Sequence, residues 1–225
     1  MSKSYQHKDI LHQKAKEDGY RGRAAYKLIE LNKKYKIFKG IKSVIDFGAS
    51  PGGWIQVALE NLQGAKIVGI DLDQIPPIEK GEKGYNELSN NTLLLIEGDI
   101  TDTTKQNEII QFIDAKADLI ISDISPHLTG IKFKDAFLAA ELVELVFYLA
   151  IFEKTTDKDM DKAVSKNSGL LKMNGSLIAK IFPGNETELL IKKYRPHFTK
   201  IHRINLDSSR KTSNEFYIFA EGRKG

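Results

Sequence analysis

The chain has 225 residues, 41% of them hydrophobic, which is enough to bury one substantial core, so a single domain spanning residues 1–225 is expected. It contains no cysteine, which excludes disulfide frameworks and thiolate metal sites and fits a reducing compartment, so we expect a cytoplasmic protein. The N-terminus lacks the apolar core of a signal peptide, and the longest apolar stretch, residues 136–152, is short for a bilayer span, so no membrane partner is expected.

The net charge of +4 is unevenly distributed along the chain. Residues 1–39 hold eleven Lys or Arg against four Asp or Glu, a net +7, and residues 190–225 hold nine against three, a net +6. The middle of the chain is therefore −9. Two basic ends are typical of contact with a polyanion such as RNA, although solvated surface faces give the same pattern.

In chain order, a basic segment of helical composition (13–31) precedes a series of strand-like apolar runs. The runs alternate with helical patterns until the last two, which are separated by a short turn, so they predict a mainly parallel sheet ending in an antiparallel hairpin. Residues 153–169 are rich in Lys and Asp and are expected to form a polar insertion. The predicted strands are 43–47, 66–70, 92–96, 117–122, 176–182, 200–206 and 215–220.

A glycine-rich segment follows the first predicted strand. Asp46 and Gly48 precede Gly52, Gly53 and Trp54, which indicates a strand, a tight loop and a helix start. The spacing lacks the second glycine of a G-x-G-x-x-G dinucleotide motif and suits a small zwitterion, such as the amino-acid part of S-adenosylmethionine, better than a diphosphate. A plain tight turn is the alternative.

Charged residues also follow the other predicted parallel strands. Asp71 ends the second strand, where a carboxylate can bind ribose hydroxyls, and Asp99 follows the third, where it can accept a bond from the adenine amine. Each could instead cap a helix. Asp123 follows the fourth strand and Lys180 lies near the end of the fifth, so the two can pair.

Lys27 in the N-terminal segment and Glu215 at the start of the last strand complete a candidate cluster with Asp123 and Lys180. Such a cluster is either catalytic or a structural set of salt bridges.

Four segments carry a family resemblance: Lys14 to Leu28, Asp46 to Trp54, Ser122 to Pro126, and Asp207 to Arg210. Together the chain resembles the FtsJ (RrmJ-type) family of RNA ribose 2′-O-methyltransferases over nearly its whole length. The resemblance implies a Rossmann-like α/β methyltransferase fold with a seven-stranded sheet and helices on both faces. It also implies S-adenosylmethionine as the cofactor and RNA as the partner, most simply a uridine of large-subunit rRNA. The segment 153–169 departs from the family by its length.

The resemblance assigns roles to individual residues. It implies a catalytic Lys-Asp-Lys-Glu tetrad at Lys27, Asp123, Lys180 and Glu215. Lys180 would act either as a neutral base or as a cation that orients the ribose hydroxyl, and the sequence leaves both open. The methyl donor would be held by Gly52, Trp54, Asp71, Asp99 and Asp123, and the glycine-loop pattern itself adds Asp46 and Gly48. The candidate phosphate contacts are Arg21, Arg23, Lys33, Lys34, Arg210 and Lys211.

Several alternatives remain at this point. The same family also contains enzymes that modify a tRNA anticodon loop or an mRNA cap, and the fold could serve a noncatalytic ribosome-assembly factor. A nicotinamide-dependent dehydrogenase is disfavoured by the glycine spacing. The five histidines show no ligand spacing, so no metal site is expected, and a monomer is expected.

Overall fold

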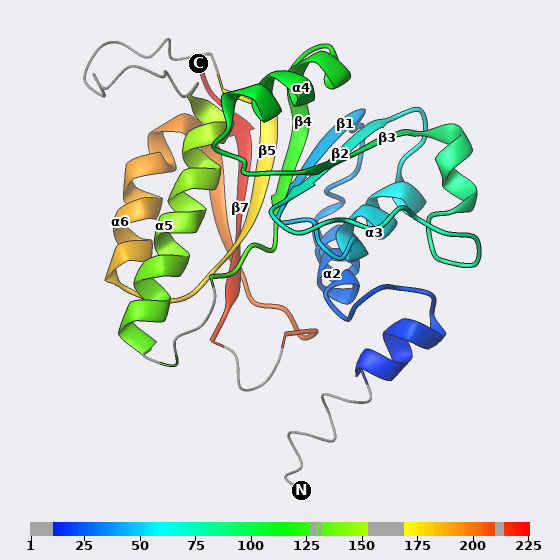
Figure 1. The fold of residues 1–225 in the computed structure, drawn as a ribbon. Helices are drawn as coiled ribbons and strands as arrows, with labels where there is room; N and C mark the ends of the chain where they lie inside the picture. Colours follow the sequence, from blue (N-terminus) through cyan, green and yellow to red (C-terminus); the bar gives the residue numbers. More distant parts are fainter. Residues whose placement is uncertain (1–10, 127–129, 131, 153–168, 210–213) are drawn as a thin grey trace, which may run out of the picture.

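A computed structural model of the chain describes residues 11–126, 130, 132–152, 169–209 and 214–225 (Figure 1). The described residues form one seven-stranded sheet with helices on both faces. The strands are β1 (Ser43–Phe47), β2 (Lys66–Asp71), β3 (Thr92–Glu97), β4 (Ala117–Ser122), β5 (Leu171–Ile181), β6 (Phe198–Ile204) and β7 (Phe216–Arg223). The helices are α2 (Ala25–Tyr35), α3 (Gly53–Asn61), α4 (Thr103–Ile113), α5 (Lys132–Ile151) and α6 (Asn185–Tyr194), with short 3-10 helices η1 (Asn86–Asn90) and η2 (Arg195–His197).

The strand order β3-β2-β1-β4-β5-β7-β6 creates a switch point at β1. Strands β1 to β5 pair in parallel, whereas β7 is antiparallel to both β5 and β6. β2 and β3 lie on one side of β1, and β4 and β5 lie on the other (Figure 1). In open sheets of this kind, ligands bind beyond the carboxyl ends of the strands, where the order reverses. The glycine-rich segment after β1 lies at this point.

The two central strands β1 and β4 are buried along their whole length. This burial explains their nearly continuous apolar sequences, because both faces of a parallel sheet are covered by helices. At the amino ends of these strands, Asp118 accepts hydrogen bonds from the backbone N–H groups of Lys42 (2.8 Å) and Ser43 (3.0 Å) and pairs with Lys172. This carboxylate joins the starts of β1, β4 and β5. These starts lie at the amino ends of the strands, opposite the end that carries the glycine loop.

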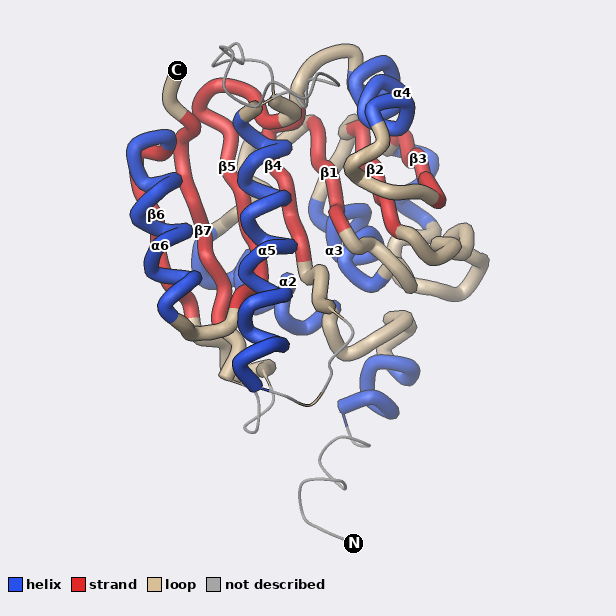
Figure 2. Tube along the Cα trace, turned by 60° about the vertical axis from the view of Figure 1, so that its left-hand side comes forward, coloured by secondary structure: helices blue, strands red, loops and turns tan. Residues whose placement is uncertain are grey.

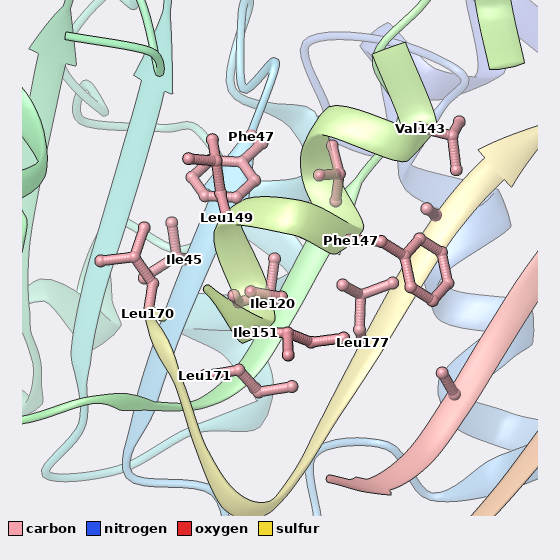
Figure 3. Packing of buried hydrophobic residues seen from close by; sticks show 14 of the residues in the cluster. Ile45, Phe47, Ile120, Val143, Phe147, Leu149, Ile151, Leu170, Leu171 and Leu177 are labelled. Atoms are coloured by element: carbon pink, nitrogen blue, oxygen red, sulfur yellow. The ribbon is translucent and has the colours of Figure 1, made fainter. Parts of the chain in front are cut away.

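Hydrophobic clusters cover the two faces of the sheet. On one face α4, α5 and α6 pack on the strands, and Figure 3 shows Phe147 and Leu149 of α5 beside Phe47 and Leu177. α2 and α3 pack on the other face, behind the sheet in Figure 2. Each large apolar side chain that is fully buried in this way stabilises the fold by roughly 1.5–3 kcal/mol.

The fold expected from the sequence is confirmed, with differences in the bounds of some elements. β6 spans Phe198–Ile204 instead of 200–206, and β7 continues to Arg223 instead of ending at 220. The helical segment expected at 13–31 is divided: residues 11–17 are helical, and α2 begins only at Ala25. Gly19, at φ +83°, lies in the intervening turn, where a residue with a Cβ would be strained. β5 begins at Leu171, five residues before the expected position.

The polar segment predicted at 153–169 lies, apart from Gly169, outside the described residues. Among the helices of the described ranges, none is both long enough and apolar enough to cross a bilayer.

Candidate functional site

The loop after β1 has a backbone conformation that only glycine adopts readily. Gly48 has φ +77° and Gly52, which immediately precedes α3, has φ +106°. A Cβ on Gly48 would lie 3.1–3.2 Å from atoms of Ile124. The Gly48 N–H donates to the carbonyl of Ile70 at 2.9 Å, so the loop is tied to the end of β2. α3 begins directly after this loop, and its first N–H groups have no partner within the helix.

Asp46 is a buried carboxylate with an unsatisfied oxygen. Only 1% of the residue is exposed, and its Oδ2 has no hydrogen-bond partner among the described residues. Burial, followed by the nearby carboxylates of Asp123 and Asp71, raises the pKa of Asp46 well above its ordinary value. A cationic ligand would relieve both effects, so the side chain suits a site that binds an ammonium group.

The carboxylates of Asp71 and Asp99 both accept hydrogen bonds from backbone N–H groups. The Asp71 carboxylate accepts from the backbone N–H groups of Ser50 and Asp73, each at 2.9 Å, and so joins the glycine loop to β2. Asp99 accepts from the Thr101 N–H at 2.7 Å and is otherwise exposed. A carboxylate oxygen can accept more than one hydrogen bond, so both residues keep capacity for ligand hydroxyls or amines.

Trp54 packs inside the protein and leaves little side chain for a ligand. The residue is 3% exposed, its indole N–H donates to the Ala24 carbonyl at 2.8 Å, and its ring centroid lies 6.0 Å from that of Tyr217. The indole thus fixes α3 to the segment before α2.

The four residues of the expected tetrad converge in one cluster. Lys27 Nζ lies 2.8 Å from Glu215 Oε1 and 3.5 Å from Asp123 Oδ1. Lys180 Nζ lies 3.3 Å from the same Asp123 oxygen and donates a 2.6 Å hydrogen bond to the Asp123 carbonyl. The side chains are only 7–19% exposed. Two cations and two carboxylates balance one another, which makes this burial tolerable.

Sheet pairing explains why residues so distant in sequence meet. Asp123 directly follows β4, and Lys180 is near the end of the neighbouring strand β5. Glu215 immediately precedes β7, the strand on the other side of β5. α2, which packs on one face of the sheet, supplies Lys27. Burial raises the pKa of Glu215, but Lys27, Ser209 and Lys180 outweigh it, and the pKa is lowered.

Tyr217 belongs to this cluster, although it was not among the residues predicted from sequence. Its hydroxyl donates a 2.6 Å hydrogen bond to Asp123 Oδ1, and Lys27 Nζ lies 5.6 Å from its ring centroid. Burial first, and then Asp123, raises its pKa well above the ordinary value, so it remains a donor. The alternation Glu215-Phe216-Tyr217 places Glu215 and Tyr217 on one face and is the signal that could have identified it.

Arg21 was expected to contact RNA, but its guanidinium is occupied within the protein. Its five N–H groups donate to both carboxylate oxygens of Glu82 and to the carbonyls of Pro51, Pro76 and Pro77. Its side chain is 8% exposed. Arg21 therefore clamps the glycine loop to the segment after β2, and its guanidinium has no N–H group left for an RNA phosphate.

The other candidate RNA contacts differ in their surroundings. Lys33 is exposed, and no described carboxylate pairs with it. Lys34 is paired with Glu30 at 2.6 Å and lies 3.8 Å from Asp207. Arg23 is partly buried, and Arg210 and Lys211 lie outside the described residues. In the part of the chain that the structure describes, no group of three or more His, Asp or Glu side chains could hold a metal ion.

Comparison with known proteins is consistent with this geometry. A family model described as FtsJ-like methyltransferase matches residues 20–223. The ribosomal RNA large subunit methyltransferase E of Methanosphaera stadtmanae is 36% identical over 221 residues, which cover 97% of this chain and 94% of that protein. The protein of the same name from Pelagibacter ubique is 33% identical over 216 residues, with 96% and 92% covered.

A solved structure of a ribosomal RNA methyltransferase from Plasmodium falciparum is also similar. It has a TM-score of 0.68 at 29% identity, and the match covers 92% of this chain and 100% of that one. The family resemblance drawn from the sequence motifs is thereby confirmed.

Proposed function

We propose that this chain, which belongs to the FtsJ-like methyltransferase family, methylates a ribose 2′-hydroxyl of large-subunit rRNA. S-adenosylmethionine would be the methyl donor. The observation that carries the proposal is the buried cluster of Lys27, Asp123, Lys180 and Glu215 beside the glycine loop. The names of its relatives support rRNA as the substrate class.

The residues around the glycine loop fit a donor of this kind. S-adenosylmethionine, when bound, supplies a methyl group activated by a positively charged sulfur. The unsatisfied oxygen of Asp46 suits the ammonium group of an amino acid, and the first N–H groups of α3, which have no partner within the helix, suit its carboxylate. Asp71 would bind the ribose hydroxyls, as an acidic residue at the end of the second strand does in dinucleotide folds, and Asp99 would accept a bond from the adenine amine.

At the acceptor side, Asp123 fixes the direction of Lys180. Its carbonyl oxygen accepts a hydrogen bond from the Lys180 amine at 2.6 Å, and its Oδ1 lies 3.3 Å from the same nitrogen. We assign Lys180, after it has lost its own proton, as the base: the lone pair of the neutral amine takes the proton of the acceptor 2′-hydroxyl. Lys27, held by Glu215, places a positive charge where negative charge develops on the attacking oxygen.

Tyr217 and Glu215 hold this arrangement from the other side of the cluster. The Tyr217 hydroxyl bonds to the same Asp123 oxygen that faces both lysines. Because positioning supplies most of the acceleration when the donor is already activated, a rigid cluster of this kind is what the reaction requires.

A noncatalytic ribosome-assembly factor with the same fold would not need this cluster. A tRNA or mRNA-cap substrate would use the same chemistry, and the proposed rRNA substrate is distinguished from these by assay rather than by the cluster.

Substitutions of Lys180 test the proposal. Lys180→Ala should reduce methyl transfer by at least 10²-fold, the range expected for loss of a general base. Lys180→Arg keeps the cation but cannot release a proton, so it should be nearly as inactive. Radiolabelled donor and undermethylated large ribosomal subunits provide the assay, and calorimetry checks that donor affinity is within about twofold of wild type.

Lys172→Ala is the matched control for the loss of a lysine that pairs with an aspartate. Lys172 pairs with Asp118 at the amino ends of the strands, away from the cluster. It should retain wild-type activity. Substantial activity of Lys180→Arg would assign Lys180 as an orienting cation, and full activity of Lys180→Ala would remove it from the mechanism.

A further inference from the structure

α2 carries two charged side chains that lie one helical turn apart and reach toward the C-terminal part of the chain. Lys27 Nζ pairs with Glu215 Oε1 at 2.8 Å. Glu30, three residues later, accepts hydrogen bonds from the backbone N–H groups of Asp207 (3.0 Å) and Ser208 (2.9 Å) and from the Ser208 hydroxyl (2.8 Å). Residues three apart share one face of a helix, so both contacts are made by the same side of α2.

The two contacts meet again at Glu215. Ser209, the residue after Ser208, donates from its hydroxyl to Glu215 Oε1 at 2.9 Å. The oxygen that Lys27 contacts is therefore also held by Ser209. Glu30 thus fixes the backbone next to Ser209, Ser209 bonds to Glu215, and Glu215 pairs with Lys27. Because Lys27 and Glu30 both belong to α2, these contacts form a closed series.

Glu30 is well suited to hold this segment. Its side chain is 15% exposed, and Lys34 lies 2.6 Å from its Oε1. Burial raises the pKa of Glu30, but the hydrogen bonds from Lys34, Asp207 and Ser208 outweigh it and lower the pKa to about 2. The side chain is thus ionised at neutral pH, and charge-assisted hydrogen bonds of this type are about twice as strong as neutral ones.

We propose that Glu30 is a positioning residue for methyl transfer. It acts on the Lys27, Asp123, Lys180 and Glu215 cluster through the backbone of residues 207–209 and the hydroxyl of Ser209. The proposal rests on the proposed function, because the cluster that Glu30 positions is the one assigned to that reaction. Without Glu30, two backbone N–H groups lose their acceptor, and the backbone of Ser209 keeps only its own N–H bond to the Leu206 carbonyl at 3.2 Å. Glu215 then no longer holds Lys27 in one place. Small misplacements of catalytic groups cost on the order of 100-fold in rate.

The kinetic test compares Glu30→Ala, Ser209→Ala and the double variant with wild type, at a temperature where circular dichroism shows each to be folded. Glu30→Ala should lower kcat about 10- to 100-fold, and the KM values for donor and rRNA should stay within about twofold. The double variant should be no slower than the slower single variant, because both changes break the same series of contacts. Glu30→Gln, which keeps an acceptor oxygen, should recover part of the activity.

Lys172→Ala again serves as the control, because it removes an ion pair that does not contact the cluster of Lys27, Asp123, Lys180 and Glu215. If Glu30→Ala does not fold, Glu30→Gln and Ser209→Ala with their double variant carry the test. Wild-type kcat in a folded Glu30 variant, or additive losses in the double variant, would overturn the proposal. Absence of ribose methylation by the wild-type protein would instead refute the proposed function.

Discussion

Asp46 is a residue at which stability and donor binding are expected to conflict. Its carboxylate is buried, one oxygen has no partner among the described residues, and its pKa is raised above the ordinary 3.8 by burial and by Asp123 and Asp71. Above pH 3.8 the unfolded chain releases this proton while the folded chain retains it. The donor-free protein therefore loses stability as the pH rises from 3.8 toward the folded pKa.

Asp46→Asn should remove this loss of stability. At pH 7 the donor-free variant should melt a few degrees higher than wild type, since 1 kcal/mol corresponds to about 2–4 °C in a chain of this size. Its donor affinity should fall about 10- to 100-fold, the usual loss for a hydrogen bond to a charged group. Thermal melts with and without S-adenosylmethionine measure both effects. A variant that is less stable and binds normally would contradict this role for Asp46.

At the scale of elements, the segment before α2 connects the glycine loop to the chain after β2. Arg21 spans this connection with five hydrogen bonds to Glu82, Pro51, Pro76 and Pro77. Its Nη1 would lie 2.8 Å from a Cβ placed on Gly52, so the guanidinium is packed directly against the glycine loop. The clamp holds the loop on which the proposed donor site is built.

Arg21→Ala should therefore raise the donor Kd by at least about tenfold, because the loop loses its fixed position. Arg21→Lys should not restore affinity, since an ammonium has three N–H groups and cannot reproduce the planar fork. The salt dependence of RNA binding should stay unchanged in both variants. A normal donor Kd combined with a reduced salt slope would assign Arg21 to a phosphate instead, and Lys33→Ala provides the comparison for that outcome.

The elements show what the sequence could and could not predict. The charged ends of the strands were predictable, because Asp71, Asp123 and Lys180 interrupt apolar runs at the positions where parallel strands end. Strand pairing then brings them together. The clamp of Arg21 and the contacts of Glu30 were not predictable, because they join residues up to 178 positions apart through loops without a periodic pattern. A basic residue beside RNA and one inside the protein look alike in sequence.

Across the whole molecule, the basic N-terminal and C-terminal segments meet. Glu30 and Lys34 of α2 contact Asp207 and Ser208, so the two basic segments approach one another beside the cluster of Lys27, Asp123, Lys180 and Glu215. We expect RNA to cross this surface, with Lys33 on one segment and Arg210 and Lys211 on the other as proposed phosphate contacts.

The affinity for rRNA should accordingly fall steeply as salt is added. Lys33→Ala should reduce the slope of log K against log salt by about one, because one phosphate contact is lost. Lys34→Ala should change the slope less, since Glu30 and Asp207 already neutralise Lys34. Filter binding at several salt concentrations measures both slopes. Equal slopes for wild type and the Lys33 variant would place the RNA elsewhere.

The most direct test of the central claim is to map the methyl group after reaction with undermethylated large ribosomal subunits and radiolabelled S-adenosylmethionine. The proposed function predicts label on one nucleotide of the large-subunit rRNA. The label should lie in an alkali-resistant dinucleotide, because a 2′-O-methyl group blocks cleavage of the adjacent phosphodiester, and it should be absent with Lys180→Ala. Label on a base, transfer to tRNA in preference to the subunit, or no transfer by the folded wild-type protein would contradict it.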